Sequence, residues 1–504
     1  MTPVPNRLRS LRTLLTPSGG LATKTVRSGV WLTATNVVVR GLELVSLLVL
    51  ARILSPADFG LIGIALLVLT ALDQFSNLGL GAALIQHRAD NVDRYLDTTW
   101  TLQIVRGVLL AGITYVLAAP AARFFAAPEV EPIIQVIAVL PLLIGLRNPG
   151  VVYFQKDLQF HRQFTYLVTN SVVYFVVTVT LAVLWGSVWA LVFGNIAARV
   201  SDMLASYLLH DYRPRPRIDV DAVRELVGFG KWVTASGIIY FFTDEGDDFV
   251  VGWLLGAASL GLYRLAYRVA LAPATELTNV VSTVMFPAYS KLKGNVGDVR
   301  AAFLRTIQLT TAVSVPASVG VIVVAPLFVE TVLGTQWVEM TVALQILSLY
   351  GLFLSLSSSF TPVWLAMGKP DYTAKIGGLR VVAMALVIVP ATTEFGIEGA
   401  AAAAGAAYVI VGLPLELYLA TRLLDFSLAG FARELAYPLT AAAAMAAVVL
   451  TARSAVETGF PTLDLALLIL LGVAVYAAVA LLFIKRLGWR LERNVRELVT
   501  AFSG

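Results

Sequence analysis

Long apolar segments recur along the whole chain, and short polar stretches separate them. A helix that crosses a bilayer needs about 20 predominantly apolar residues, and these runs reach 18 or more. None shows the ten-residue alternation of an outer-membrane barrel strand. The pattern predicts an all-α polytopic membrane protein with about 14 transmembrane helices. The predicted spans are 29–51, 59–86, 97–119, 130–153, 164–184, 187–209, 227–254, 258–288, 303–327, 338–366, 373–391, 397–420, 435–452 and 463–484.

The composition agrees with this pattern. Of the 504 residues 58% are hydrophobic and 14% are charged, and the mean hydropathy is +0.80. A soluble domain has about 25% charged residues, and a disordered chain is poor in apolar residues. The chain has no cysteine, which excludes disulfides and thiolate sites, and its three histidines are too scattered for a metal cluster. We therefore expect no metal and no cofactor other than a coupling ion, H⁺ or Na⁺.

Lysine and arginine in the loops predict the orientation. With the N-terminus on the cytoplasmic side, 25 of the 37 basic residues fall in cytoplasmic segments and three fall in outer loops, namely Arg52, Arg123 and Arg453. Both termini are therefore expected in the cytoplasm, with the protein in the cell membrane. The positive charge then faces anionic membrane lipids, so the net charge of +5 does not imply a nucleic-acid partner.

The two ends of the chain are expected to lie outside the spans. The basic segment 1–28 leads into a full-length span, so no cleavable signal peptide is predicted. At the other end, the segment 485–504 has the pattern of an amphipathic interfacial helix. Its apolar residues Leu491, Val495, Leu498, Val499 and Phe502 share one helical face.

An internal repeat lies at an offset of 201 residues. Residues 29–68 align without a gap to 230–269, and 11 of the 40 pairs are identical, among them Trp31 with Trp232 and Gly60 with Gly261. Six spans separate the copies, so the copies have the same orientation and form parallel lobes around a central cavity. The predicted parts are an N-lobe at 29–209, a cytoplasmic linker at 210–226, a C-lobe at 227–420 and two further spans within 421–484.

Several ionisable residues lie inside predicted spans, where they cost free energy and mark functional sites. Guanidinium groups bind phosphate and aromatic rings stack on sugars, whereas a buried carboxylate takes up a proton or holds sodium. The candidate residues for substrate phosphate and sugar are Arg40, Arg106, Arg264, Arg268, Tyr263 and Tyr267. The candidate residues for ion coupling are Glu43, Asp73, Asp244, Asp247, Asp248 and Glu276. Glu43 and Asp244 are equivalent under the repeat.

Structural readings of these residues stay open. Arg264 and Arg268 begin a few residues into a span, so they fit side chains that extend to the outer headgroup layer. Asp247 and Asp248 fit ion-pair partners of those arginines. Arg40 and Glu43 fit a buried structural pair, and Arg106 and Arg380 are weak signals when taken alone.

Enzymatic activity is not expected. The Gly-x-x-x-x-Gly-Lys-Ser/Thr phosphate-binding motif is missing from the sequence, and the histidines do not combine with a nucleophile at one membrane face. The outer loops have at most about ten residues each, too few for a catalytic domain.

Four stretches resemble one family of membrane proteins. They are LARILSPADFGLIGIA at 50–65, DDFVVGWLLGAASLGLYRLAY at 247–267, VMFPAYSKL at 284–292 and GKPD at 368–371. Together they resemble the Wzx-type polysaccharide flippases of the PST family, within the multidrug/oligosaccharidyl-lipid/polysaccharide exporter superfamily. Trp253 departs from the pattern, since relatives often have Arg or Lys there, so a contact at that position is not transferred.

The resemblance implies a fourteen-helix, two-lobed fold with a cationic central cavity. It also implies translocation of lipid-linked oligosaccharide repeat units from the cytoplasmic to the outer leaflet by alternating access, coupled to a proton or sodium gradient. The implied partners are a polyprenyl- or dolichyl-(pyro)phosphate-linked glycan, membrane lipids and glycan polymerases or transferases. The alternative function is a multidrug/cation antiporter of the same fold, whose cavity would be dominated by carboxylates and aromatic rings.

Overall fold

The protein is described by a computed structural model that covers residues 21–77, 79, 93–157, 159–220, 223, 234, 237–239, 241–456 and 458–486. Among these residues every regular element is helical, as predicted. The chain divides into two compact units, unit 1 at Met1–Phe241 and unit 2 at Phe242–Gly504. Each unit is described by itself. The finer boundaries predicted for the lobes and the linker stay predictions.

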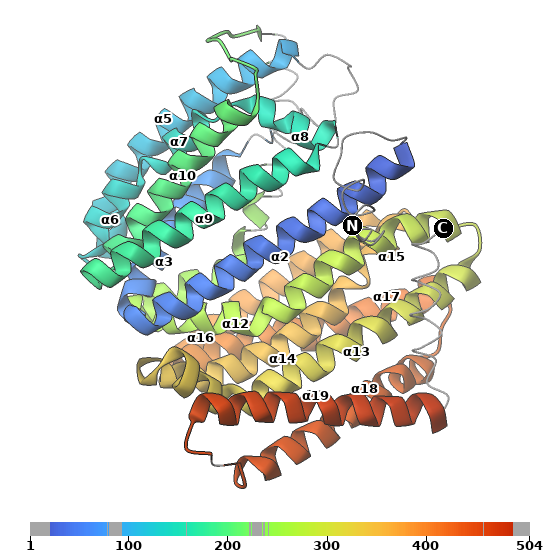
Figure 1. Ribbon diagram of the computed structural model, residues 1–504. Coiled ribbons are helices and arrows are strands. Elements are labelled where there is room, and N and C mark those ends of the chain that lie inside the picture. Colours follow the sequence, from blue (N-terminus) through green and yellow to red (C-terminus); the bar gives the residue numbers. More distant parts are fainter. Residues whose placement is uncertain are drawn as a thin grey trace, which may run out of the picture. The chain divides into compact units, whose positions relative to one another are not determined.

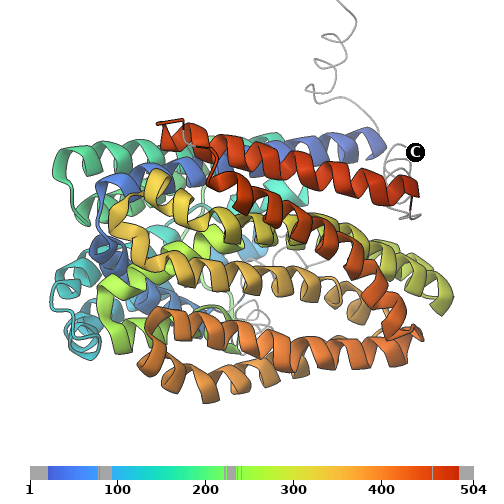
Figure 2. The same ribbon diagram turned by 90° about the horizontal axis from the view of Figure 1, so that it is seen from below.

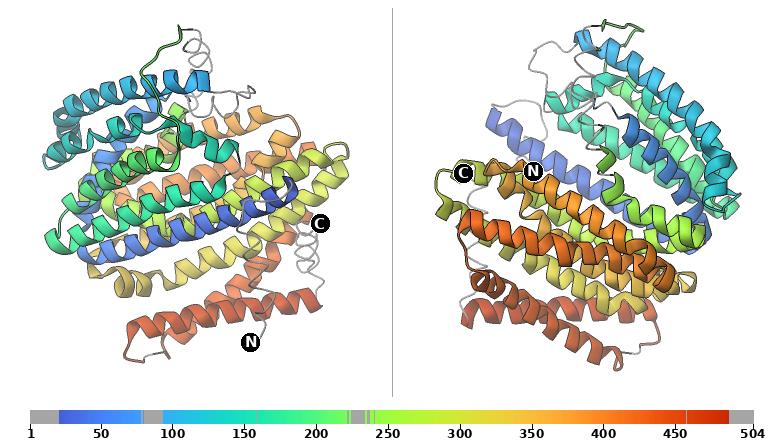
Figure 3. Two further views of the ribbon diagram at one scale, coloured as in Figure 1. Left: turned by 45° about the horizontal axis from the view of Figure 1, so that its top comes forward. Right: turned by 180° about the vertical axis from the view of Figure 1, so that it is seen from behind.

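Unit 1 is a bundle of long helices in which α9 packs against α2 and α10, and α5 packs against α6 and α7 (Figure 1). The further views show α2 and α9 side by side as well (Figure 3). Its elements are α2 (Leu21–Ile53), α3 (Pro56–Ser76), α5 (Asp93–Phe124), α6 (Val130–Ile137), α7 (Leu140–Gly145), η1 (Pro149–Val151), α8 (Val152–Lys156), α9 (Phe160–Trp185) and α10 (Trp189–Leu209).

Close backbone approach holds α5 and α7 together. A Cβ on Gly107 would lie 2.6 Å from the carbonyl oxygen of Pro141, and a Cβ on Gly145 would lie 2.5 Å from that of Gln103. Small residues at such crossings are how helices associate in lipid, where burial of apolar surface gives no driving force.

Unit 2 is a second helical bundle, in which α12 packs against α13, α14 and α16. The C-terminal helices α18 and α19 pack on each other and on α13, and the view from below shows them as neighbours (Figure 2). Its elements are α12 (Gly246–Leu292), α13 (Val296–Phe328), η2 (Val329–Leu333), η3 (Thr335–Met340), α14 (Thr341–Ser358), α15 (Thr361–Ala366), α16 (Pro370–Ala406), η4 (Ala407–Gly412), α17 (Leu413–Leu424), α18 (Leu428–Arg453) and α19 (Pro461–Arg486).

Two glycines turn the chain inside the long helices of unit 2. Gly256 has φ 80° and ψ −176°, and Gly396 has φ 60° and ψ −142°. Backbone angles in this region are essentially restricted to glycine. The repeat pairs Gly256 with Ser55, which caps the start of α3 after the break that follows α2. The two copies of the repeat therefore turn at the same position.

The structure does not confirm the count of fourteen spans. Among the described residues ten helices are long and apolar enough to cross a membrane, or eleven if the bent pair Val130–Gly145 and Pro149–Lys156 is one span. The glycine turns join predicted spans 7 with 8 and 11 with 12 into continuous helical segments. The helix α10 is not among the ten, because Asn195, Arg199 and Asp202 lower its mean hydropathy.

Candidate functional site

The helix that begins unit 2 is interrupted inside predicted span 227–254. Glu245 has φ −119° and ψ 0°, and α12 begins at the next residue. Asp247 and Asp248 therefore lie in the first turn of α12, where the free N–H groups and the helix dipole favour negative charge. Both aspartates are buried. A broken helix that carries charged groups is how transport proteins build binding sites within the membrane.

The turn at Gly256 brings the second half of α12 back onto these acids. The hydroxyl of Tyr263 donates to Oδ2 of Asp247 at 2.7 Å. Arg264 Nε lies 3.0 Å from Oδ2 of Asp248, and its Nη2 lies 3.3 Å from Oε2 of Glu245. In the sequence, Gly256 lies about midway between each aspartate and its partner, so the turn places these residues opposite each other. The ion-pair reading of the sequence therefore holds for Asp248 with Arg264, whereas Asp247 binds a tyrosine.

A chain of tyrosine rings leads away from Asp247. The rings of Tyr263 and Tyr267 have centroids 6.3 Å apart, Tyr267 and Tyr350 are 6.2 Å apart, and Tyr350 and Tyr408 are 5.1 Å apart. These residues come from α12, α14 and η4, so the chain ties three elements of unit 2 together. Tyr263 has no exposed surface, so in this conformation its ring does not offer a free face to a sugar.

Arg380 lies at the far end of the tyrosine chain. Its guanidinium carbon lies 4.1 Å from the ring centroid of Tyr408, a cation–π contact. Its Nη2 pairs with Oε1 of Glu416 and donates to Oγ of Ser357 at 2.6 Å. Gly412 makes room for this side chain, because a Cβ there would collide with the guanidinium group. Arg380 and Glu416 are therefore a buried, hydrogen-bonded ion pair.

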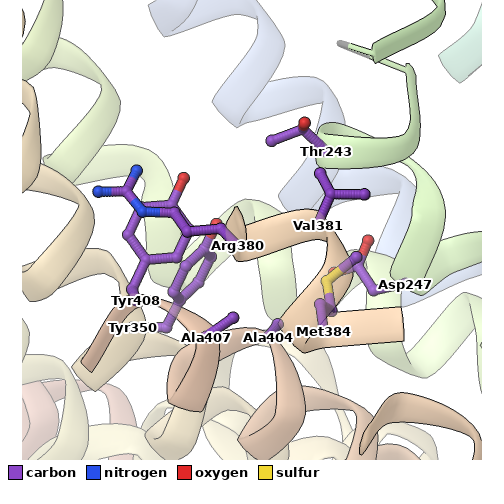
Figure 4. A pocket seen from close by; sticks show the side chains of 9 residues that line it. All are labelled: Thr243, Asp247, Tyr350, Arg380, Val381, Met384, Ala404, Ala407 and Tyr408. Carbon is purple, nitrogen blue, oxygen red and sulfur yellow. The ribbon is translucent and has the colours of Figure 1, made fainter. Parts of the chain in front are cut away.

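A narrow cavity connects the two ends of this network. It encloses about 310 Å³ including its open mouth, and its interior admits guests of the size of water or a small ion. Figure 4 shows Arg380 with Tyr350 and Tyr408 at one end and Asp247 with Met384 at the other. A carboxylate flanked by tyrosines suits a proton, a water molecule or a small cation, and it does not suit a large polyanion.

The predicted residues of unit 1 are paired within that unit. Arg106 Nη2 lies 2.7 Å from Oδ1 of Asp73, and the same guanidinium group donates to Ser76 at the end of α3. Arg40 and Glu43 form an exposed pair at 2.9 Å, one turn apart on α2. The predicted pairing of Arg40 with Glu43 is therefore present, although the pair is exposed rather than buried.

The structure brings together part of the predicted set. One network in unit 2 contains five of these residues, namely Asp247, Asp248, Tyr263, Arg264 and Tyr267. Arg268 and Asp244 are exposed, and the side chain of Glu276 lies outside the described residues. The assignment of these residues to phosphate binding and ion coupling stays a prediction.

Sequence reasoning missed Tyr350, Tyr408, Ser357 and Glu416. The signal for Glu416 was present, because it is the acidic residue nearest the middle of predicted span 397–420, and Arg380 lies in the preceding span. The turn at Gly396 lies 16 residues after Arg380 and 20 residues before Glu416, so the two charges return to similar depths. The tyrosines gave no signal, because isolated aromatic residues in apolar spans are ordinary.

The fold and its buried charges define the class first: a helical, multi-pass membrane protein of the transporter type. The family described as "Polysaccharide biosynthesis protein" matches residues 49–342, which is more than half of the chain. The chain belongs to this family, and the resemblance predicted from its motifs is confirmed.

Curated relatives carry consistent names. The chain is 27% identical over 357 residues to the lipopolysaccharide biosynthesis protein WzxC of Escherichia coli, covering 70% of this chain and 72% of WzxC. It is 26% identical to the teichuronic acid biosynthesis protein TuaB of Bacillus subtilis, covering 58% and 61% of the two chains. It is 25% identical to the succinoglycan biosynthesis transport protein ExoT of Rhizobium meliloti, covering 70% and 72%.

Solved structures show the same fold at low sequence identity. The lipid II flippase MurJ in an inward-closed conformation matches with a TM-score of 0.74 at 15% identity, covering 90% of this chain and 99% of MurJ. An inward-facing multidrug resistance transporter of the MATE family, within the MOP superfamily, matches with a TM-score of 0.60 at 14% identity, covering 79% and 99%. These likenesses concern the fold.

Proposed function

We propose that this protein is a flippase that moves lipid-linked glycan units across the cell membrane. Its membership of the polysaccharide biosynthesis family is the observation that carries the proposal, and the fold it shares with a lipid II flippase supports it. The chain moves its substrate without a chemical step. In this role one lobe rocks against the other, so that the headgroup site opens to the cytoplasm and to the outside in turn.

The substrate headgroup is a glycan on a polyprenyl or dolichyl phosphate or pyrophosphate. Guanidinium groups bind such phosphates in a two-pronged geometry. Arg106 and Arg264 are held by carboxylates, so a phosphate reaches them by displacing Asp73, or Asp248 and Glu245. Arg40, which is exposed together with its partner Glu43, and Arg268, which is also exposed, are accessible to the substrate for the first contact. The lipid tail stays in the bilayer.

Ion coupling belongs to the acidic network of unit 2. Loss of the negative charge at Asp248, by protonation or by cation binding, weakens its ion pair with Arg264, and Asp247, which lines the cavity, gives the ion access to this pair. This loss thereby makes the arginine available to phosphate. This exchange links the gradient to the substrate, with H⁺ or Na⁺ as the coupling ion.

The proposed setting follows the basic residues of the loops. Both termini lie in the cytoplasm, and the substrate enters from the cytoplasmic leaflet. The enzymes that build and polymerise the glycan lie upstream and downstream of this step, and a glycan polymerase or transferase is the expected protein partner.

The multidrug/cation antiporter is the second candidate, and the residue types that line the cavity of unit 2 are the observation in its favour. Its carboxylate and tyrosines suit a cationic guest, and the MATE fold is shared. Against it stand the family match and the arginines within the spans. The cavity is also too narrow for a drug-sized cation.

The decisive experiment uses the host with this gene deleted. Lipid-linked oligosaccharides are extracted, and their sidedness is measured in oriented membrane vesicles. The flippase proposal expects accumulation on the cytoplasmic face and loss of the surface glycan, with rescue by the wild-type gene. An unchanged surface glycan together with new sensitivity to cationic drugs would establish the antiporter instead.

The coupling proposal has its own test in proteoliposomes. Flipping of a fluorescent lipid-linked glycan is followed under a proton gradient and under a sodium gradient. Asp247→Asn is expected to remove the dependence on the gradient that drives the wild type, whereas Asp371→Asn, an exposed acid on α16, is expected to keep it. Gradient dependence that survives in Asp247→Asn and Asp248→Asn would place coupling elsewhere.

A further inference from the structure

The segment that follows α10 is bound along α5 and forms a strap, defined here as residues 210–219. It has no regular secondary structure, and its hydrogen bonds to α5 go to one short stretch of that helix. Asp97 on α5 accepts from the Tyr212 hydroxyl at 2.6 Å and from the N–H of Arg215 at 2.8 Å. The side chains of Thr101 and Thr98 accept from the N–H groups of Arg217 at 3.0 Å and of Asp219 at 3.1 Å.

The two prolines of the strap fit this register. Pro216 stands between Arg215 and Arg217, whose N–H groups bind α5, and Pro214 directly precedes Arg215. Proline has no N–H and fixes φ near the extended value, so the two prolines place no donor at these positions and stiffen the strap. Asn148 fixes the start of the strap by donating from Nδ2 to the carbonyl of Tyr212 at 2.6 Å.

The strap presents basic and apolar side chains to its surroundings. Arg213, Arg215 and Arg217 are exposed, and next to them Ile218 and Val220 are 61% and 66% exposed. The guanidinium group of Arg213 stays on the strap, donating to the carbonyls of His210 and Tyr212. A rigid row of arginines beside exposed aliphatic side chains is the composition of a membrane-surface element.

Three acids lie on or against the strap, namely Asp97, Asp211 and Asp219, and each keeps its negative charge. Asp97 faces the strap, where it accepts from the Tyr212 hydroxyl and from the N–H of Arg215. Asp211 is the exposed acid of the strap, against three exposed arginines. The strap contacts α5 at Asp97–Thr101, near the start of the candidate span Tyr95–Phe124, so the proposal expects the strap at the membrane surface.

We propose that the strap, together with Val220 directly after it, binds the headgroups of acidic phospholipids, with Arg215 and Arg217 on the phosphates and with Ile218 and Val220 in the interface. The proposed site contains none of the residues assigned to substrate binding or ion coupling, and it does not depend on the proposed flippase function. Each arginine near an anionic surface strengthens lipid binding about fivefold, and salt weakens the effect.

The absence of cysteine from the natural sequence allows a direct test. Ile218→Cys is labelled with an environment-sensitive fluorophore in the full-length protein, which is placed in nanodiscs of phosphatidylcholine alone or of phosphatidylcholine mixed with phosphatidylglycerol. The label is expected to shift its emission to the blue and to be quenched by headgroup-labelled lipid when phosphatidylglycerol is present. High salt should reverse both effects.

Two variants decide the outcome. R215Q/R217Q in the labelled protein is expected to abolish the response to phosphatidylglycerol and to weaken its binding, measured by native mass spectrometry, more than tenfold. R453Q, in a predicted outer loop, should leave both unchanged. Equal emission in the two lipid mixtures, or an undiminished response in the well-folded R215Q/R217Q protein, would overturn the proposal. A response to soluble inorganic pyrophosphate in phosphatidylcholine nanodiscs that matches the response to phosphatidylglycerol would also overturn it.

Discussion

Arg380 on α16 and Glu416 on α17 form a buried ion pair, although 36 residues separate them in the chain. The turn at Gly396 sets this distance, and Gly412 leaves room for the guanidinium group. The ring of Tyr408 packs against the guanidinium group of Arg380, and both residues line the cavity. The pair fixes the helices that form one wall of the cavity, whose other end holds Asp247.

Removal of one partner of this pair should be strongly destabilising. Glu416→Gln leaves the guanidinium group buried without its counter-charge, at a cost of about 3–5 kcal/mol, whereas the double variant R380M/E416L should recover much of the loss. The measurement is the thermal unfolding midpoint of the purified protein in detergent.

The same helix offers a matched control for this experiment. Lys375 and Asp371 form an exposed pair at 2.7 Å, and Lys375→Met should lower the midpoint only slightly, because exposed ion pairs contribute little to stability. If Glu416→Gln and Lys375→Met lower the midpoint equally, the pair of Arg380 and Glu416 is not buried as described.

The turn at Gly256 should depend on backbone conformation alone. A Cβ at Gly256 meets no atom within 4 Å, so Gly256→Ala adds no clash, but its positive φ should cost about 1–3 kcal/mol. Gly112→Ala is the matched change, because it also meets no atom within 4 Å but lies in the interior of α5, where alanine is favoured.

Thermal unfolding distinguishes the two glycine variants. Gly256→Ala should lower the midpoint, and Gly112→Ala should leave it unchanged or raise it. A neutral Gly256→Ala would mean that the chain at this position adopts an ordinary helical conformation.

The sequence predicted the class of fold well and the site in part. Hydrophobic segments predicted the helices, because the length of an apolar run is a local property. The number of separate spans was less accessible, since Gly256 and Gly396 join neighbouring helices through turns of a single residue. The polarity of α10 also depends on Asp202, a buried acid that pairs with Arg199 at 3.1 Å.

The candidate site was likewise predicted only where the signal was local in the sequence. The acids at 247 and 248 are a local signal, and the arginines one turn apart on the next span are another. Which acid meets which partner depends on the turn at Gly256, and the contacts of Tyr350 and Tyr408 depend on packing between helices that are distant in sequence. The spacing of apolar and polar residues along the chain does not predict these contacts.

His210 makes the stability of unit 1 depend on pH. Burial and the nearby charge of Arg162 lower the pKa of its imidazole below the ordinary value of 6.5, and its Nδ1 accepts from the N–H of Tyr212 at 3.1 Å. The unfolded chain therefore binds the proton first as the pH falls. The contribution of this group is complete above about pH 6.5 and declines below it, by at most about 1.4 kcal/mol per pH unit, until the folded pKa is reached.

Two histidine variants test this dependence. The unfolding midpoint of the wild type should fall between pH 7 and pH 5, and His210→Gln should fall less steeply. His161→Gln, at an exposed position on α9, should follow the wild type. Identical slopes for His210→Gln and the wild type would show that other groups control the pH dependence.

Arg264 and Arg268 should be needed for flipping rather than for insertion. Both lie on α12 beyond the turn at Gly256, and Arg264 is held by Asp248 and Glu245. Arg264→Ala or Arg268→Ala should reduce flipping of a lipid-linked glycan by at least tenfold, because the loss of one charged hydrogen bond to phosphate costs about 1.5–3 kcal/mol. The measurement is transfer in proteoliposomes, with the amount of membrane-inserted protein determined in parallel.

The control for these variants is Arg422→Ala, which removes an arginine stacked on Tyr418 in the last turn of α17. It should leave flipping unchanged. Arg264→Lys separates the two roles of Arg264, since lysine keeps the charge that balances Asp248 and lacks the two-pronged geometry. If Arg264 binds phosphate, Arg264→Lys should fold normally but flip the lipid-linked glycan poorly. Wild-type rates in both alanine variants would exclude these arginines from the phosphate site and leave Arg40 and Arg106 as the remaining candidates.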